Sequence, residues 1–344
     1  MTATRHKWLS IVIAVTALAI QFGCRPSGQQ QVVVYTALDS EFSEPILESF
    51  STETGVEALT KFDTESTKTV GLTTAIMAEA NRPRCDVFWN NEILNTLRLK
   101  KQGLLAVYRS PAAASYPEVF RDPDGAWHGF AGRARILLVN TEVVPETERP
   151  TSIHDLADPR WKGRVSIAKP LFGTTATHAA CLFTALGEHQ AKDFFRSLTA
   201  NDIRIEAGNK QVAKSVAAGR AAIGLTDTDD ALVMIDEGFP VAIVYPDREP
   251  DQLGTLFIPN TLCIIKDCPH PEQAKRLVDY LLRPEVESRL ALGPSGQIPL
   301  NPEVDVRARV ETPKTVKAMV VDIQAAAERW DTAAQFIRDE FFTE

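Results

Sequence analysis

Three carboxylates stand within four positions of this 344-residue sequence, at Asp227, Asp229 and Asp230. They directly follow an apolar stretch at residues 222–226 that is typical of a buried strand. If the strand continues, alternation places Asp227 and Asp229 on one side, where they would bind a cation, a metal ion or a ligand hydroxyl. If a helix begins at Thr228 instead, Asp229 and Asp230 lie in its first turn, which favours negative charge in any case.

Two arginines, Arg133 and Arg135, stand at alternate positions of the long apolar stretch at residues 129–140. A guanidinium in such surroundings needs an anionic partner, because an unpaired buried charge is costly. That partner is either a structural carboxylate or a bound anion. Both arginines are therefore candidates for balancing charge at a ligand site.

Polar side chains also follow the other predicted strands, at the positions where ligands bind to open parallel sheets. Residues 173–175 (Gly-Thr-Thr) open a helix whose amides and hydroxyls suit an anion, although either threonine could be an ordinary helix cap. Residues 66–69 (Ser-Thr-Lys-Thr) combine hydroxyls with a cation and would bind a phosphate or carboxylate, or merely cap a helix. The candidate ligand-binding residues after these strands are Asp39, Ser66, Thr67, Asn90, Asn91, Glu92, Thr174 and Thr175.

The elements that must position these residues alternate between strand and helix patterns. Residues 31–102 predict strand, helix, strand, helix, strand and helix, which is the order of a parallel sheet with crossover helices. The alternation restarts after residues 129–140, and a late apolar stretch at 256–265 predicts a strand that returns to the first sheet. Residues 313–342 predict one long helix or two broken helices.

The predicted fold class is α/β with two lobes, each a mainly parallel sheet flanked by helices. A chain of 344 residues is too long for one ordinary core and suits two lobes. The expected division assigns residues 31–135 and 245–344 to lobe 1 and residues 136–244 to lobe 2.

The N-terminus has the pattern of an export signal. A basic start precedes an apolar run at residues 8–20, which is too short to span a membrane comfortably, and Gly23-Cys24 follows. We expect residues 1–24 to be a lipoprotein-type signal peptide, with Cys24 as the lipidated cysteine, and residues 25–30 to be a polar tether. Simple cleavage near Gly23 and an uncleaved anchor are the alternatives. The expected location is periplasmic or extracytoplasmic, attached to the membrane through Cys24.

Composition excludes several classes of function. The formal net charge of -8 argues against a nucleic-acid partner. No nucleophile elbow, phosphate-binding loop or dinucleotide fingerprint occurs, and no cysteine or histidine spacing indicates structural zinc. His178 is a candidate metal ligand, although a lone helical histidine is more often a surface side chain. The four later cysteines are expected to be buried thiols, with a disulfide between Cys263 and Cys268 as the alternative.

Several stretches resemble the ferric-iron-type solute-binding proteins of ABC importers. The Gly-Arg-Ala-Arg motif and Leu-Ala-Asp-Pro-Arg-Trp-Lys-Gly are the more specific parts of the resemblance. It implies the type II periplasmic-binding-protein fold, in which two lobes close on a ligand about a hinge, and an ABC permease and ATPase as partners. The resembling stretches are residues 33–36, 50–56, 85–89, 132–140, 155–165 and 216–230.

The chain departs from this family at the expected ligand positions. Ferric members usually hold the metal with two adjacent tyrosines where this chain has Asp229 and Asp230, and many use a histidine where it has Asp39. Carboxylate is a hard ligand, as phenolate is, so Asp229 and Asp230 are the expected metal ligands if Fe3+ is transported. Relatives of the same fold take phosphonates, sugar phosphates, thiamine or polyamines, and a polar organic ligand fits this chain at least as well.

The predicted function is that of the extracytoplasmic solute-binding component of an ABC transporter, which binds ferric iron or a polar organic anion between its lobes. No residue is expected to be catalytic, because no activated nucleophile is evident, and Fe3+ is expected only as a transported ligand. The alternatives are an exported metal-dependent enzyme and a sensory ligand-binding protein on the same fold.

Overall fold

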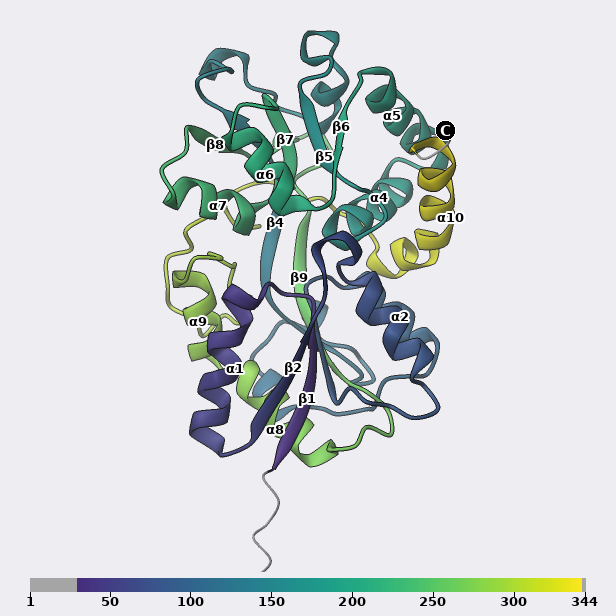
Figure 1. The fold of residues 1–344 in the computed structure, drawn as a ribbon, viewed down its shortest axis with the longest axis vertical. Helices are drawn as coiled ribbons and strands as arrows, with labels where there is room; N and C mark the ends of the chain where they lie inside the picture. Colours follow the sequence, from purple (N-terminus) through teal and green to yellow (C-terminus); the bar gives the residue numbers. More distant parts are fainter. Residues whose placement is uncertain (1–29, 342–344) are drawn as a thin grey trace, which may run out of the picture.

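The computed structural model describes residues 30–341 as a two-lobed α/β molecule (Figure 1). Two central strands, β4 (His128–Asn140) and β9 (Phe257–Ile264), run between the lower and the upper half. Helices flank the strands in both halves. Within residues 30–341, no helix combines the length and the apolar character that crossing a membrane requires.

The lower half confirms the crossover pattern predicted for residues 31–102. Its parallel strands are β1 (Gln31–Thr36), β2 (Glu57–Phe62) and β3 (Val87–Asn90). Their crossover helices are α1 (Ser40–Thr54), α2 (Val70–Ala78) and α3 (Leu94–Lys101). Val32, Val34 and Val87 are completely buried, because a central parallel strand is covered on both faces.

Strand β4 changes its pairing partners part-way along its length. Residues 128–134 pair antiparallel with β9, whereas residues 135–140 pair antiparallel with β7 (Ile223–Asp227) and β8 (Val241–Val244). β9 also pairs with β3, as predicted for the late apolar stretch. The pairing path is therefore continuous, in the order β2-β1-β3-β9-β4-β7, and β4 carries it from one half to the other.

The upper half repeats the strand–helix alternation after β4. Its parallel strands β5 (Val165–Ala168) and β6 (Arg204–Glu206) extend the order beyond β7. Strand β8 was not predicted, because a four-residue stretch that is only half-buried has little periodicity. The helices of this half are α4 (Gly173–Ala185), α5 (Glu188–Ala200), α6 (Asn209–Ala217) and α7 (Thr228–Asp236).

The helix predicted from residue 313 was placed too early. After α8 (Pro271–Leu281) and α9 (Pro284–Leu292), helix α10 begins only at Ile323 and runs to Phe341. The preceding backbone pairs instead with the loop before β9: Thr255 N–H donates to the Lys317 carbonyl at 2.9 Å, and the Thr255 carbonyl accepts from Met319 N–H at 2.8 Å. These backbone groups cannot form helical bonds at the same time. Helix α10 packs outside α4 and α3, so it touches both halves.

Short 3-10 turns connect these elements. They comprise Glu65–Thr67, Pro111–Ala113, Glu118–Phe120, Glu146–Glu148, Ile153–Ala157 and Pro159–Trp161.

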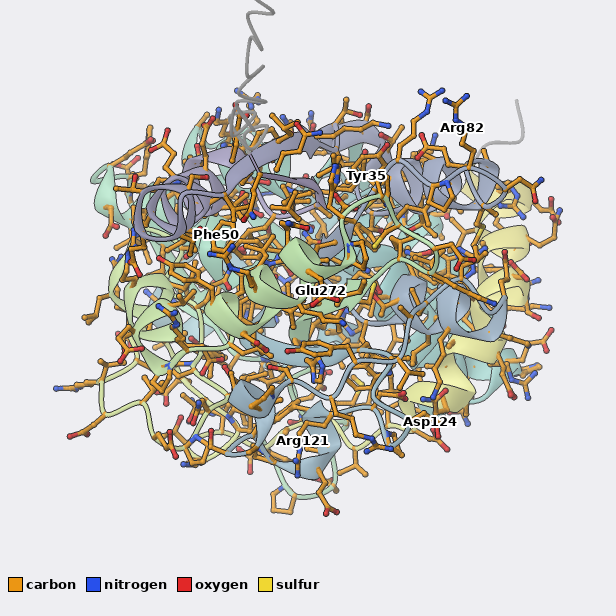
Figure 2. The ribbon with its side chains drawn as sticks, turned by 90° about the horizontal axis from the view of Figure 1, so that it is seen from below. Tyr35, Phe50, Arg82, Arg121, Asp124 and Glu272 are labelled. Atoms are coloured by element: carbon orange, nitrogen blue, oxygen red, sulfur yellow. The ribbon has the colours of Figure 1, made fainter. Side chains whose placement is uncertain are left out.

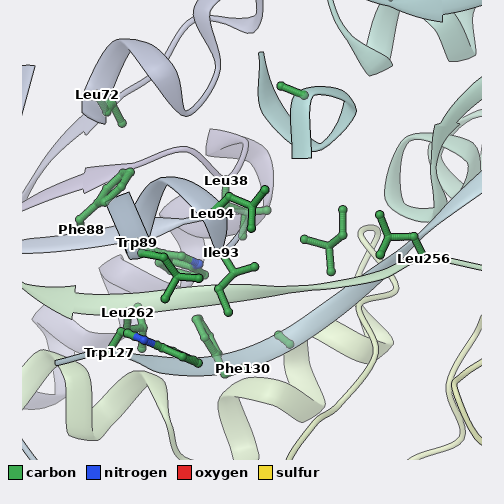
Figure 3. Packing of buried hydrophobic residues seen from close by; sticks show 14 of the residues in the cluster. Leu38, Leu72, Phe88, Trp89, Ile93, Leu94, Trp127, Phe130, Leu256 and Leu262 are labelled. Carbon is green, nitrogen blue, oxygen red and sulfur yellow. The ribbon is translucent and has the colours of Figure 1, made fainter. Parts of the chain in front are cut away.

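A hydrophobic core surrounds the central strands (Figure 3). Trp89 of β3 lies against Phe130 of β4, with ring centroids 5.4 Å apart. Phe50, labelled on the left of Figure 2, which views the molecule from below, packs edge-on against Tyr280 with ring centroids 5.3 Å apart. The four cysteines after residue 30 are buried free thiols, so the disulfide alternative for Cys263 and Cys268 does not hold.

Candidate functional site

Arg135 and Asp227 are directly opposite one another on the paired strands β4 and β7. Arg135 Nη1 lies 2.6 Å from Asp227 Oδ1, and both side chains are buried. Thr174 Oγ1 donates to Asp227 Oδ2 at 2.5 Å, and Asn209 Nδ2 donates to the same oxygen at 3.0 Å. Arg135 also donates to Thr175 Oγ1 at 3.1 Å. The partner of Arg135 is therefore a structural carboxylate, and these side chains use most of their hydrogen-bonding capacity on each other.

Arg133 and Asp229 form a second, looser pair. Arg133 Nη1 lies 3.4 Å from Asp229 Oδ2, and Arg133 Nη2 donates to Asn260 Oδ1 at 2.8 Å. Both side chains are more than nine-tenths buried. Burial raises the pKa of Asp229 to about 6; Arg133 opposes this rise, whereas Asp227 and Asp39 add to it. Arg133 therefore stabilises the Asp229 carboxylate only partly.

Helix α7 begins at Thr228, so the strand does not continue through the three carboxylates. The alternative in which Asp229 and Asp230 occupy the first helical turn is correct, and the alternating-strand interpretation is wrong. Thr228 Oγ1 accepts a hydrogen bond from Ala134 N–H at 3.2 Å, which fixes the helix start against β4. Even so, ligand atoms of Asp227, Asp229 and Asp230 all lie within 4.8 Å of one another.

A mixed cluster of charges from both halves lies near these aspartates. Lys68, just before α2, forms an ion pair with Asp39, which precedes α1. Lys210 Nζ of α6 lies 3.9 Å from the other Asp39 oxygen. Burial acts to raise the pKa of Asp39, but Lys68, followed by Lys210 and Arg133, outweighs it and lowers this pKa below its ordinary value. Lys68 and Asp39 also act electrostatically on Asp229, so cations and carboxylates from both halves converge here.

Two of the predicted ligand residues bond within their own loop. Thr67 Oγ1 donates to Asp63 Oδ1 at 2.9 Å and lies 2.6 Å from Thr64 Oγ1, while Ser66 is exposed. The neighbouring Lys68, rather than these hydroxyls, reaches the charge cluster. Thr69, the next residue, has a φ of 68°, an unusual backbone conformation for threonine.

Asn90, Asn91 and Glu92 form a buried polar group after β3. Asn90 Nδ2 donates to Glu92 Oε1 at 2.7 Å, and the Glu92 carboxylate accepts the Asn95 N–H at 3.0 Å. Thr177 Oγ1 of α4 donates to Glu92 Oε2 at 2.9 Å. Glu92 thus ties the start of α3 to α4 of the other half.

The comparisons with known proteins agree with this arrangement. The family model described as bacterial extracellular solute-binding protein matches residues 95–328, more than half of the chain. This chain belongs to that family. This membership confirms the family resemblance seen in the sequence. The solute-binding protein is the extracytoplasmic binding component of an ABC importer, and importers of this class also contain permease and ATPase components.

Relatives of this solute-binding protein are named for different ligands. It is 27% identical over 278 residues to iron uptake protein A1 of Synechocystis sp., covering 77% of this chain and 75% of that protein. It is 23% identical over 216 residues to the Fe(3+)-binding periplasmic protein of Serratia marcescens, covering 62% of each. It is also 23% identical over 241 residues to a putative 2-aminoethylphosphonate-binding periplasmic protein of Salmonella typhi, covering 69% and 68%.

Solved structures confirm the predicted type II periplasmic-binding-protein fold. Iron-bound HitA from Pseudomonas aeruginosa has a TM-score of 0.81 at 22% identity, covering 90% of this chain and 99% of that one. AfuA from Actinobacillus pleuropneumoniae, with fructose-6-phosphate bound, has a TM-score of 0.81 at 23% identity, covering 91% and 98%. At these identities the likeness establishes the fold.

All five tyrosines of the solute-binding protein lie within the described residues, and each hydroxyl is bonded elsewhere. Their partners are Glu79 for Tyr35, Asp279 for Tyr108, the Leu282 carbonyl for Tyr116, the Glu311 amide for Tyr245 and Glu53 for Tyr280. Burial raises the pKa of Tyr245 to about 12. No phenolate of this chain is therefore positioned to replace the ferric-binding tyrosines.

His178 lies in an apolar part of α4 rather than beside the carboxylates. It lines a small void with Ile167 and Leu225, and its ring nitrogens have no hydrogen-bond partner among residues 30–341. Burial, with a smaller effect of Arg135, lowers the pKa of His178 to about 3, so the ring is neutral. These surroundings do not suit a metal ligand.

The sequence prediction missed Asn209 and Lys210, which lie at the start of α6 and reach the two charge clusters. The strand-end rule that found the other loops would also have found them, because β6 ends at Glu206 and α6 begins at Asn209.

Proposed function

We propose that this solute-binding protein carries a polar organic anion, bound between its lobes, to an ABC permease and ATPase. The observation that carries the proposal is that positive and negative side chains lie together around Asp229. Both Arg133 and Lys68 act electrostatically on the Asp229 carboxylate. Bare ferric ion needs several anionic donors and is repelled by such cations. A ligand with an anionic group and hydroxyl or amino groups uses both signs.

The aspartates differ in how available they are to a ligand. Asp227 is saturated by Arg135, Thr174 and Asn209, so it is unsuited to bind a ligand without breaking a buried network. Asp229 and Asp230 lie in the first turn of α7. Asp229 Oδ2 forms the 3.4 Å pair with Arg133, and Asp229 Oδ1 accepts the neighbouring Asp230 N–H at 3.2 Å, so its carboxylate is held less tightly than that of Asp227. We therefore assign ligand binding to Asp39, Lys68, Arg133, Asp229 and Asp230, and a supporting role to Arg135, Asp227, Thr174 and Thr175.

A complex of ferric ion with an organic anion is the second candidate. It is favoured by the carboxylate atoms of Asp227, Asp229 and Asp230, which lie within 4.8 Å of one another. In that case the cations would hold the organic anion, and Asp229 and Asp230 would be the metal ligands. The relatives named for iron and the structure of Trichodesmium IdiA with iron and citrate support this candidate.

Calorimetry distinguishes these candidates. The protein, purified without its first 24 residues, is titrated with ferric nitrilotriacetate, ferric citrate, 2-aminoethylphosphonate and fructose-6-phosphate. We expect a phosphonate or phosphate ester to bind without iron, and Asp229→Ala with Asp230→Ala to abolish that binding. Glu237→Gln, an exposed change at the end of α7, is the matched control. Binding only of ferric compounds would overturn the proposal, as would full binding by the double variant.

The proposal keeps the lobe boundaries that the sequence predicts. Residues 31–135 with 245–344 are assigned to lobe 1 and residues 136–244 to lobe 2, so that Arg135 lies at the crossing. This assignment is supported by the change of β4 partners between Ala134 and Arg135.

Export and anchoring complete the proposed function. Residues 1–24 serve as a lipoprotein-type signal, Cys24 carries the lipid, and residues 25–30 are the tether; all but Gln30 lie outside the described residues. The protein acts as a receptor and not as an enzyme, which its membership in a solute-binding family supports.

A further inference from the structure

Lys210, which was not among the predicted site residues, connects the two lobes through an ion pair. It lies on α6 of the upper half, and its Nζ is 2.9 Å from Glu41 Oε1 on α1 of the lower half (Figure 1). The same ammonium is 3.9 Å from Asp39 Oδ2. Lys210 therefore pairs with one lobe while its backbone belongs to the other.

Other contacts also cross between the lobes, and two of them involve α4. Gly173 N–H at the start of α4 donates to the Lys68 carbonyl at 2.9 Å, and Thr177 Oγ1 donates to Glu92 Oε2 at 2.9 Å. All three contacts join protein groups of one lobe to protein groups of the other. They define an interface whose formation closes one lobe on the other.

The Lys210–Glu41 pair differs from the other two contacts because water reaches it. The Lys210 side chain is 28% exposed and that of Glu41 is 46% exposed, whereas Glu92 and Thr177 are buried. An exposed ion pair is weak and is screened by salt. A weak contact suits a reversible closing motion, because a strong one would fix the protein in a single state.

We propose that Lys210 is a positioning residue that acts as an electrostatic latch between the lobes. Its pairing with Glu41 raises the fraction of unliganded protein in which the lobes are closed. This inference rests on the proposed lobe boundaries, but it does not depend on the identity of the ligand. Loss of the latch lowers ligand affinity about two- to fivefold, since the binding-competent fraction falls.

Hydrogen exchange at the Gly173 amide tests the latch without any ligand. This amide donates to Lys68 across the lobes, so its exchange reports how often they separate. In 20 mM salt we expect Glu41→Gln and Lys210→Gln to speed exchange at Gly173 severalfold. Glu48→Gln, an exposed change on the same helix α1, should leave the rate unchanged.

Salt provides a second readout. Raising the salt concentration to 500 mM should speed exchange at Gly173 in the unaltered protein and have little effect in Glu41→Gln. Equal exchange rates in the unaltered protein and both single variants would overturn the latch, whatever ligand is found. Faster exchange in the single variants, together with failure of every ligand in calorimetry, would contradict only the proposed ligand class.

Discussion

Arg133 Nη1 lies 3.4 Å from Asp229 Oδ2, whereas two residues further along β4 Arg135 Nη1 lies 2.6 Å from Asp227 Oδ1. Arg135 therefore lies closer to its carboxylate partner than Arg133 does. Arg135 and Asp227 are cross-strand partners with additional threonine and asparagine contacts, so their geometry is fixed. Asp229 belongs to a helix rather than to the sheet, and its longer distance leaves room for a ligand group to compete for Arg133.

Asp229→Asn should stabilise the unliganded protein near pH 7 while weakening ligand binding. Burial raises the pKa of Asp229 from 3.8 to about 6, so between these values the folded state holds a proton that the unfolded state has lost. Stability must therefore fall as pH rises through this window. Asparagine removes that loss, which amounts to about 2–3 kcal/mol. Denaturant unfolding from pH 4 to pH 7 measures it.

The pH dependence of the Asp229→Asn variant provides the control. Asp39 has a lowered pKa, so its contribution is present above 3.8 and is lost as pH falls through its folded-state pKa. The two aspartates thus act in separate pH windows. An unchanged slope between pH 4 and pH 6 in Asp229→Asn would show that Asp229 is not the titrating group.

Asp227→Ala should destabilise the fold strongly. It removes the carboxylate from a completely buried Arg135 and leaves a charge without its counterion. Breaking one side of a buried pair costs about 3–5 kcal/mol. Denaturant unfolding measures the loss, with Asp251→Ala, in an exposed loop, as the control. A loss below about 1 kcal/mol would mean that the threonines and Asn209 satisfy Arg135 alone.

Gly173→Ala should loosen the contact between the lobes. Gly173 has a φ of 57°, which alanine adopts only with strain, while an added Cβ would meet the Lys68 side chain at an ordinary 3.8 Å. The strain, about 1 kcal/mol or more, therefore comes from the backbone rather than from a clash. We expect weaker ligand binding and a lower melting temperature. Gly187→Ala has a similar φ of 79° and open space, and it should lower stability without affecting ligand affinity.

Cys24→Ser should release the protein from the membrane fraction. A thiol is required for lipid attachment, and serine keeps the size and polarity of the site. Fractionation of cells that express each form, followed by immunoblotting, measures the distribution. Equal membrane association of both forms would show that the apolar run at residues 8–20, and not a lipid on Cys24, holds the protein there.

The order of elements could be read from the sequence because it depends on local patterns. The β-branched run at Gln31–Thr36 and the helix that ends before Gly55 carry their own periodicity and stop signal, and both occur where predicted. The start of α10 could not be found in this way. Residues 313–322 lie between the predicted and the observed start of this helix, and Lys317 and Met319 among them bond to Thr255, a partner far away in the sequence.

The sequence by itself determined that charged residues cluster after apolar strands and that both arginines need anionic partners. Only the tertiary structure decided which partners they have. Arg135 meets Asp227 because β4 and β7 pair in that register, and Arg133 meets Asp229 because α7 begins at Thr228. Lys210 reaches Glu41, 169 positions earlier, because the lobes pack together. Local patterns carry no information about such distances, since chain folding alone brings these charges within a few ångströms.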